Sequence, residues 1–398
     1  RSYMPIEKFT ISRDDAVYEC FPHLCRTRSG RILLVYRESN GHVASEYCRL
    51  VVRYSDDAGH SWSERRVVCD EDRSSGVLTT WNGPKIQQLQ DGRILLLCDQ
   101  VKYPPGEWGS EDRCRIWLRF SDDEGLTWSE PQPTPVAGIC PDQVTELSDG
   151  GWLLPSNVRS AKTDRIIQNI TISRDQGQTW QAPTTLFDHP DYQLDEVSIV
   201  RMPTGELVAY QREDLGRPVQ KLISRDEGES WQGPYDTLNP ASIGMPIAGV
   251  TQDGFVMVTG RYGLPGSWRP NASAELWQMR LAKRGIVIPK VPQTEAFVAG
   301  IERGPHTAET DDELIIAQGG SSVHTLAFLE PVESALATEK GTQKGTVLPL
   351  DLDASPFADS GYTGWVEYER GQFLVVNYIN DDAPMAQIRG YRFGLEDF

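Results

Sequence analysis

Apolar and polar positions along the chain recur as a hairpin unit. Each unit consists of a strand, a turn that usually contains glycine, and a second strand that is strongly apolar. In the first unit Gly30 lies in the turn, and Ile32–Tyr36 forms the apolar strand. Seven such hairpins are predicted, over residues 21–36, 84–97, 144–154, 197–208, 247–258, 306–316 and 365–376. The pattern predicts an all-β protein made of many short strands.

An octapeptide with the pattern S-x-D-x-G-x-[S/T]-W follows four of these hairpins, at Ser55–Trp62, Ser121–Trp128, Ser173–Trp180 and Ser224–Trp231. Its aspartate can accept hydrogen bonds from backbone N–H groups of a turn, and its glycine can adopt a positive φ. Its tryptophan can cover the apolar layer beneath, and its hydroxyls can tie the loop ends together. This chemistry favours a structural hairpin turn over a ligand-binding loop.

The spacing of the units predicts a β-propeller, since about 50–60 residues per unit suits a four-stranded antiparallel blade. Seven blades are favoured. Six are the alternative, if residues 235–360 form one elaborated blade. The last unit is short, so we expect the segment Phe9–Ile11 to supply its outer strand and close the ring. Nothing divides the chain, and residues 1–398 are predicted to form one propeller domain.

The octapeptides are similar to Asp-boxes (BNR repeats), and the whole chain resembles the sialidase (neuraminidase) superfamily of propellers. The resemblance implies an arginine triad that grips a sugar carboxylate, a tyrosine nucleophile activated by a glutamate, and an aspartate acid/base. Position by position, Tyr362 matches the nucleophile and Glu196 its partner. Arg212 and Arg261 match two arginines of the triad. The resemblance therefore implies an enzyme that releases a terminal acidic sugar.

Two positions depart from the family pattern. The family begins its first blade with Arg-Ile-Pro, whereas Cys20, Phe21 and Pro22 stand here, so Arg37 would have to complete the triad. The loop that should carry the acid/base aspartate contains no aspartate, which leaves His42, Glu38 or Glu46 to donate the proton.

The chemistry of the residues supports a polar site where the inner strands converge on the channel. His23, Asn82 and Asp142 are expected there as further substrate-binding residues. Guanidinium groups bind carboxylates in a bidentate manner. A phenol has a pKa near 10 and becomes a competent nucleophile when a neighbouring carboxylate accepts its proton.

The composition narrows the classes of partner molecule that are expected for this protein. The formal net charge of -18 argues against a nucleic-acid ligand, because a phosphate backbone favours basic proteins. The chain has no run of 18 apolar residues, so no transmembrane helix is expected. The seven cysteines lie within the first 140 residues without a CxxC pair, which indicates buried thiols rather than zinc ligands or disulfides. No metal or cofactor is predicted, and the compartment and oligomeric state stay open.

Three functions are weighed. The first is a sialidase-like exo-glycoside hydrolase, motivated by Tyr362, Glu196, Arg212 and Arg261. The second is a polysaccharide lyase that acts on a uronate, which seven blades and His23 and His42 would favour. The third is a glycan-binding propeller without catalysis, motivated by the two departures from the family pattern.

Overall fold

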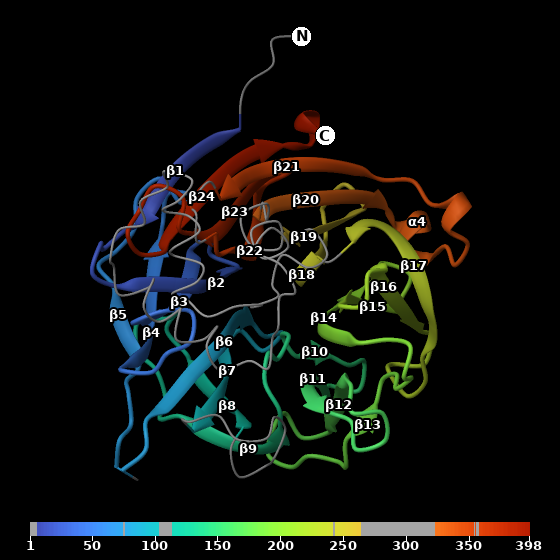
Figure 1. The fold of residues 1–398 in the computed structure, drawn as a ribbon, viewed down its shortest axis with the longest axis horizontal. Coiled ribbons are helices and arrows are strands. Elements are labelled where there is room, and N and C mark those ends of the chain that lie inside the picture. Colours follow the sequence, from blue (N-terminus) through green and yellow to red (C-terminus); the bar gives the residue numbers. More distant parts are fainter. Residues whose placement is uncertain are drawn as a thin grey trace, which may run out of the picture.

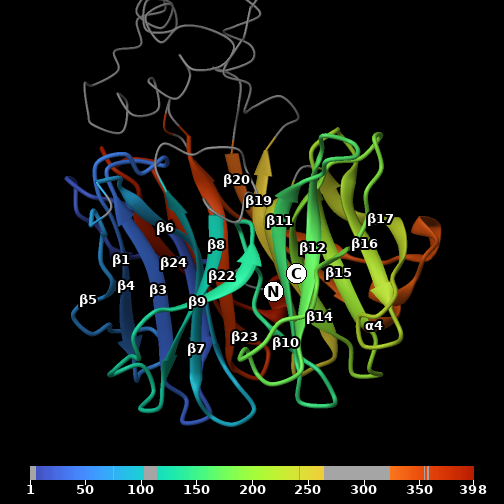
Figure 2. The same ribbon diagram turned by 90° about the horizontal axis from the view of Figure 1, so that it is seen from below.

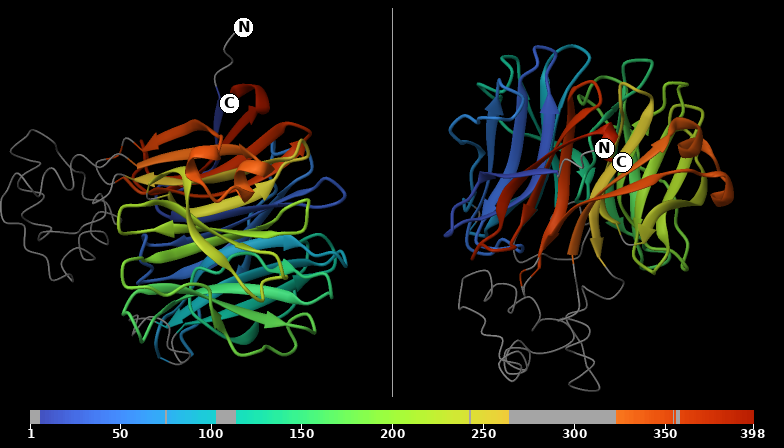
Figure 3. Two further views of the ribbon diagram at one scale, coloured as in Figure 1. Left: turned by 90° about the vertical axis from the view of Figure 1, so that its right-hand side faces the viewer. Right: turned by 90° about the horizontal axis from the view of Figure 1, so that it is seen from above.

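The computed structural model describes residues 6–74, 76–102, 114–241, 243–263, 323–353, 355 and 358–398. These residues form six four-stranded antiparallel sheets that surround one axis as the blades of a propeller (Figure 1). Turned on its side, the ring shows the blades standing face to face (Figures 2 and 3). The all-β propeller is confirmed with the six-blade alternative, and the favoured count of seven is wrong.

The first three blades follow the chain order. Blade one contains β2 (Tyr18–Arg26), β3 (Ile32–Ser39), β4 (Cys48–Ser55) and β5 (Arg66–Cys69). Blade two contains β6 (Thr79–Gln88), β7 (Ile94–Lys102), β8 (Cys114–Ser121) and β9 (Gln132–Ala137). Blade three contains β10 (Thr145–Glu146), β11 (Trp152–Arg159), β12 (Ile166–Ser173) and β13 (Thr184–Thr185).

The other three blades complete the ring. Blade four contains β14 (Leu194–Arg201), β15 (Leu207–Glu213), β16 (Pro218–Ser224) and β17 (Gln232–Ala241). Blade five contains β18 (Ile243–Val250), β19 (Phe255–Gly263), β20 (Val323–Pro331) and β21 (Thr346–Asp353), with the short helix α4 (Val332–Leu336) between the last two. Blade six contains β22 (Ser360–Glu369), β23 (Gln372–Ile379), β24 (Gln387–Gly394) and β1 (Glu7–Ser12).

The strand pairing in blade five explains why the predicted count of seven blades is too high by one. The partner of β19 is β20, and the two strands pair antiparallel from Phe255 with Pro331 to Gly263 with Val323. The long stretch between them is therefore an insertion within one blade. The sixth predicted hairpin, residues 306–316, lies outside the described residues.

The N-terminal strand closes the ring. Strand β1 pairs antiparallel with β24, and Phe9 lies opposite Gly390. The two strands lie side by side in Figures 1 and 2. The first strand of the chain thus becomes the outer strand of the last blade, where the short final unit required one.

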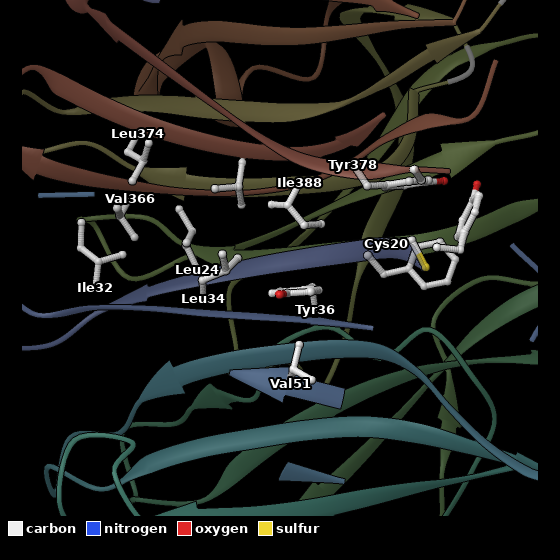
Figure 4. Packing of buried hydrophobic residues seen from close by; sticks show 14 of the residues in the cluster. Cys20, Leu24, Ile32, Leu34, Tyr36, Val51, Val366, Leu374, Tyr378 and Ile388 are labelled. Atoms are coloured by element: carbon white, nitrogen blue, oxygen red, sulfur yellow. The ribbon is translucent and has the colours of Figure 1, made fainter. Parts of the chain in front are cut away.

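The core lies between adjacent blades. All eight residues of β3 are buried, because one face of its sheet packs on blade two and the other on blade six. Figure 4 shows the contact between blades one and six, where apolar side chains of both meet: Leu24, Ile32, Leu34, Val366, Leu374 and Ile388. All seven cysteines are free thiols, and six of them are buried. Within the described part of the chain, no helix has the length and apolar character that a membrane span needs.

The Asp-box at Ser121 has the hydrogen bonds of a tied turn. The Asp123 carboxylate accepts a bond from the Thr127 backbone N–H at 2.8 Å and another from the Thr127 hydroxyl at 2.6 Å. The Ser121 hydroxyl accepts the Gly125 N–H at 2.8 Å and donates to Asp123 at 2.8 Å. Gly125 has a φ of 84°, and Trp128 packs against the core between blades one and two. The structural interpretation of the box follows from this geometry.

Replacing Ser121 by alanine tests this turn. Ser121 is buried, so Ser121→Ala leaves the Gly125 N–H without its acceptor and should lower the free energy of unfolding by about 1–2 kcal/mol. Urea denaturation measures the change. Asp122→Ala in the same box removes an exposed side chain and should change it by less than about 0.5 kcal/mol. Equal effects of the two variants would contradict the structural role of the serine.

Candidate active site

A cavity of about 330 Å³ lies where the inner strands of several blades converge. Its lining includes six of the residues that the sequence nominated, namely Arg37, His42, Asn82, Glu196, Arg212 and Tyr362. They come from blades one, two, four and six. Segments far apart in the chain therefore meet at one hollow, as the propeller geometry predicts.

Tyr362 and Glu196 are in direct contact at this cavity. The Tyr362 hydroxyl donates a hydrogen bond to Glu196 Oε1 across 166 positions of sequence. Both residues lie at irregularities of the innermost strands: the register of β14 shifts between Asp195 and Val197, and that of β22 shifts between Ser360 and Thr363. Gly361, with a φ of 96°, supplies the unusual backbone that precedes Tyr362. These bulges redirect side chains from a regular strand toward the cavity.

The protonation states of this pair follow from its surroundings. Burial and the charge of Glu196 hold the pKa of the Tyr362 phenol well above its usual value. Burial alone would raise the pKa of Glu196, but the charges of Arg212 and Arg261 and the bond from Tyr362 bring it below the ordinary value. A neutral phenol therefore faces an ionised carboxylate, which is the starting arrangement for proton transfer from oxygen to oxygen.

Two arginines flank the pair. Arg212 Nη1 lies 3.2 Å from Glu196 Oε2, and its Nε donates to Asp214 at 2.7 Å. The backbone N–H of Met245 also donates to Glu196 Oε2, at 2.6 Å. The Arg261 guanidinium lies over the Tyr362 ring, 4.9 Å from its centroid. Both guanidinium groups thus approach Tyr362 from neighbouring blades.

Arg37 is held differently. It is buried, and it donates to the Asn82 side chain and to the backbone carbonyls of Gly41, at 3.0 Å, and His42. Its guanidinium also lies 4.4 Å from the centroid of the Phe21 ring. Arg37 lines the cavity, but its hydrogen bonds fix the loop that carries His42.

Phe21 follows Cys20, which stands at the position of the first arginine in the family pattern. Its ring lies 5.2 Å from that of Tyr362 and 5.3 Å from that of His42. Its φ of 55° is unusual for an aromatic residue and marks the bulge between β2 and β3. The cavity therefore has an aromatic side chain beside the tyrosine. The sequence analysis noted only that the arginine of the family pattern is missing there.

His42 has a partner that the sequence analysis missed. Its Nδ1 lies 2.7 Å from Oδ2 of Asp359, a buried carboxylate just before β22. The search for an acidic group covered only the loop after Arg37, in blade one. Asp359 instead comes from blade six, three positions before Tyr362. Its closeness in sequence to the tyrosine was the signal that could have found it.

Four nominated residues lie outside the cavity lining: Arg261, which lies over the Tyr362 ring, and three others. Glu38 is buried beside Arg65, at 3.1 Å, because neighbours on a strand point to opposite faces and Arg37 takes the inward direction. His23 is buried and accepts the Ile86 N–H at 3.2 Å. Asp142 is buried and accepts the Ile199 N–H at 2.7 Å. We leave Glu38 out of the proposed machinery, and we assign the other two to the packing of the inner strands.

Two further carboxylates, Asp99 and Asp195, line the cavity. Burial raises the pKa of Asp99 to about 6. Burial and the neighbouring Glu196 raise the pKa of Asp195. The negative charge of the cavity therefore falls as the pH is lowered from neutral.

Comparison with known proteins identifies the class. The BNR repeat-like domain family matches residues 12–258. The chain belongs to this family, within the sialidase and BNR-repeat superfamily of β-propellers.

Individual relatives agree with this placement. Sialidase-3 of Rattus norvegicus is 30% identical over 178 residues, which cover 39% of this chain and 40% of that protein. The chain thus matches less than half the length of this curated relative. A protein of unknown function from Dyadobacter fermentans has a TM-score of 0.67 at 17% identity, with 98% of both chains covered. The Hadza microbial sialidase Hz136 has a TM-score of 0.61 at 15% identity, with 98% of this chain and 68% of that one covered. These structures share the fold.

Proposed function

We propose that this protein is a retaining exo-glycoside hydrolase that releases a terminal acidic sugar. The observation that carries the proposal is the hydrogen bond from the half-buried Tyr362 to the ionised Glu196, flanked by Arg212 and Arg261. Tyrosine is the nucleophile of sialidases, an exception among glycosidases that otherwise use two carboxylates. The sialidase relatives support a glycoside hydrolase of this kind.

The reaction proceeds in two displacements. The Tyr362 oxygen attacks the anomeric carbon, its proton passes to Glu196, and the glycosidic oxygen departs with a proton from His42. Water then attacks the same carbon, gives its proton to His42, and the Tyr362 oxygen leaves and regains its proton from Glu196. Two inversions retain the configuration, and a neutral attacking oxygen avoids repulsion from the carboxylate of the sugar.

The acidic sugar is inferred from the guanidinium groups. Arg212 and Arg261 are positive charges beside the nucleophile, where the carboxylate of a sugar bound at Tyr362 would lie. The raised pKa of Asp99 adds a pH dependence, because protonation of this carboxylate near pH 6 removes a repulsive charge. We expect free N-acetylneuraminic acid to bind at least about fivefold more tightly at pH 5.5 than at pH 8.

Isothermal titration calorimetry at the two pH values measures this ratio. In Asp99→Asn the charge is removed at every pH, so the ratio should shrink and the affinity at pH 8 should rise. Glu38→Gln removes a carboxylate that faces Arg65 away from the cavity, and it should keep the wild-type ratio. An affinity that rises with pH in the wild-type protein would contradict an anionic ligand.

The covalent intermediate offers the direct test. In a 2,3-difluoro derivative of N-acetylneuraminic acid, the nucleophile displaces the anomeric fluoride and bonds to the anomeric carbon. The second fluorine slows the release of the sugar from the protein. Intact-mass and peptide analysis should find one added sugar on Tyr362, and none in Tyr362→Phe. A label on another residue would contradict the proposed nucleophile.

The alternatives give different results in parallel assays. A lyase would release an unsaturated uronate that absorbs in the ultraviolet, but the described residues form six blades rather than the seven that favoured a lyase, and His23 is buried. A binding protein would retain a sialoside or uronide without turning it over. Either outcome, together with an unlabelled Tyr362, would overturn the proposal.

A further inference from the structure

The buried carboxylate of Asp359 contacts side chains from blades one, five and six. Only 4% of the Asp359 side chain is exposed, and it is faced by three side chains from different strands and by one from the loop after β3. Oδ2 accepts hydrogen bonds from His42 Nδ1, at 2.7 Å, and from the Tyr18 hydroxyl. Oδ1 accepts one from the Tyr378 hydroxyl, at 2.7 Å, and lies 3.9 Å from Arg261 Nη1. The backbone N–H of Asp359 is itself bound, at 2.9 Å, to the carboxylate of Asp353.

We propose that His42 and Asp359 form the acid/base unit of the site, with His42 as the proton donor and Asp359 as the residue that positions it. This inference rests on the proposed hydrolase function and deepens it. It replaces the single aspartate of the family pattern, which the loop after β3 lacks, by a histidine–carboxylate dyad built across blades one and six.

Asp359 is not placed to transfer the proton itself. It lies outside the cavity lining, and both of its oxygens are occupied by donors. His42 does line the cavity, with 30% of its side chain exposed. Burial would raise the pKa of Asp359, but the charge of His42 and its hydrogen bond, followed by Arg261, bring it below the ordinary value. The carboxylate therefore stays ionised beside the imidazole.

The bond to Asp359 sets the state of His42. The carboxylate accepts a hydrogen bond from Nδ1–H, so it fixes the neutral tautomer and leaves Nε2 as the nitrogen that gains and loses the catalytic proton. The Phe21 ring and Arg37, whose guanidinium donates to the His42 carbonyl, also face His42. They hold the ring and its loop in place.

The proton balance of the first displacement is closed. Cleavage leaves the electron pair of the glycosidic bond on the departing oxygen, and that oxygen takes the proton from Nε2 of the His42 imidazolium. His42 becomes neutral with Nδ1–H still bound to Asp359. In the second displacement the neutral ring accepts the proton of the attacking water at Nε2, which restores the imidazolium.

Leaving-group dependence separates an acid catalyst from a structural residue. Sialyllactose has a poor leaving group that needs a proton, whereas 4-nitrophenyl sialoside has a good one that does not. His42→Gln and Asp359→Asn should each lower turnover of sialyllactose about 100-fold or more, and that of the aryl sialoside less than about 10-fold.

A matched control removes another buried carboxylate. Glu330 accepts hydrogen bonds from Tyr210, at 2.7 Å, and Ser334, at 2.8 Å, in blade five and away from the cavity. Glu330→Gln should affect the two substrates equally. Equal losses for both substrates in His42→Gln, or in a folded Asp359→Asn, would overturn the dyad.

The wild-type protein provides a test that needs neither folding of a variant nor turnover. Nitrogen-15 NMR of the imidazoles, with His42 assigned by His42→Gln, should show the neutral ring protonated on Nδ1. A neutral ring protonated on Nε2 would overturn the role of Asp359. Labelling of Tyr362 by the difluoro sugar is independent of this result, so a failed dyad and a failed hydrolase assignment are distinguishable.

Discussion

Tyr362→Phe is expected to lower kcat on an aryl sialoside by at least about 10³-fold, in a protein that still folds. The phenylalanine ring keeps the contacts with Phe21 and Arg261 but has no oxygen to attack the anomeric carbon. Water can still enter, yet it must displace the leaving group in a single step without the covalent intermediate. The loss should therefore appear in kcat rather than in KM.

Stability and a distant tyrosine serve as controls for this variant. The loss of the hydroxyl leaves Glu196 Oε1 without its donor, which should cost about 1–3 kcal/mol of unfolding free energy. Tyr235→Phe, on the outer strand β17, should keep full activity. Turnover of Tyr362→Phe within tenfold of the wild type would reject the tyrosine nucleophile.

Glu196→Gln should have the second largest effect, a loss of about 10²–10⁴-fold in kcat. An amide cannot take the phenolic proton, and the pKa of Tyr362 is already held high by burial. The pH profile carries a further signature. The pKa of Glu196 lies below its ordinary value, so wild-type activity should persist to a lower pH than an ordinary glutamate would allow and then fall on an acid limb as this carboxylate is protonated. The variant should lack that limb.

Asp214→Asn is the matched control, because Asp214 binds the same Arg212 without touching Tyr362. It should weaken the positioning of the guanidinium and cost less than about tenfold in kcat. If Asp214→Asn and Glu196→Gln lost the same activity, the effect would belong to Arg212 rather than to proton transfer. Stopped assays between pH 3 and 9 on all three proteins would separate these outcomes.

Local sequence patterns predicted the architecture well, because each blade carries its own signals. The Asp-boxes specify turns through bonds within eight residues, such as Ser121 to Gly125, and these bonds form wherever the octapeptide stands. The blade count failed because pairing between β19 and β20 is set by partners about 60 residues apart, which a hairpin search does not connect.

The site was predictable where one residue could be matched to one position. Tyr362, Glu196 and Arg212 meet as the family pattern implies. The proposed acid/base unit was not, since it depends on a contact between His42 and Asp359, 317 positions apart. Glu38 failed for a local reason: the direction of alternate side chains on β3 was settled by Arg37.

The pairing of β1 with β24 has a consequence for how the protein would unfold if a force pulled on its N-terminal strand. His42 stands on one side of the junction between blades one and six, and Tyr362 and Asp359 stand on the other. Detaching β1 from β24 would let blades one and six separate at the apolar contact between them. The proposed proton donor would then move away from the proposed nucleophile while most of the sheets stayed folded. Catalytic activity should therefore be lost before the propeller unfolds as a whole.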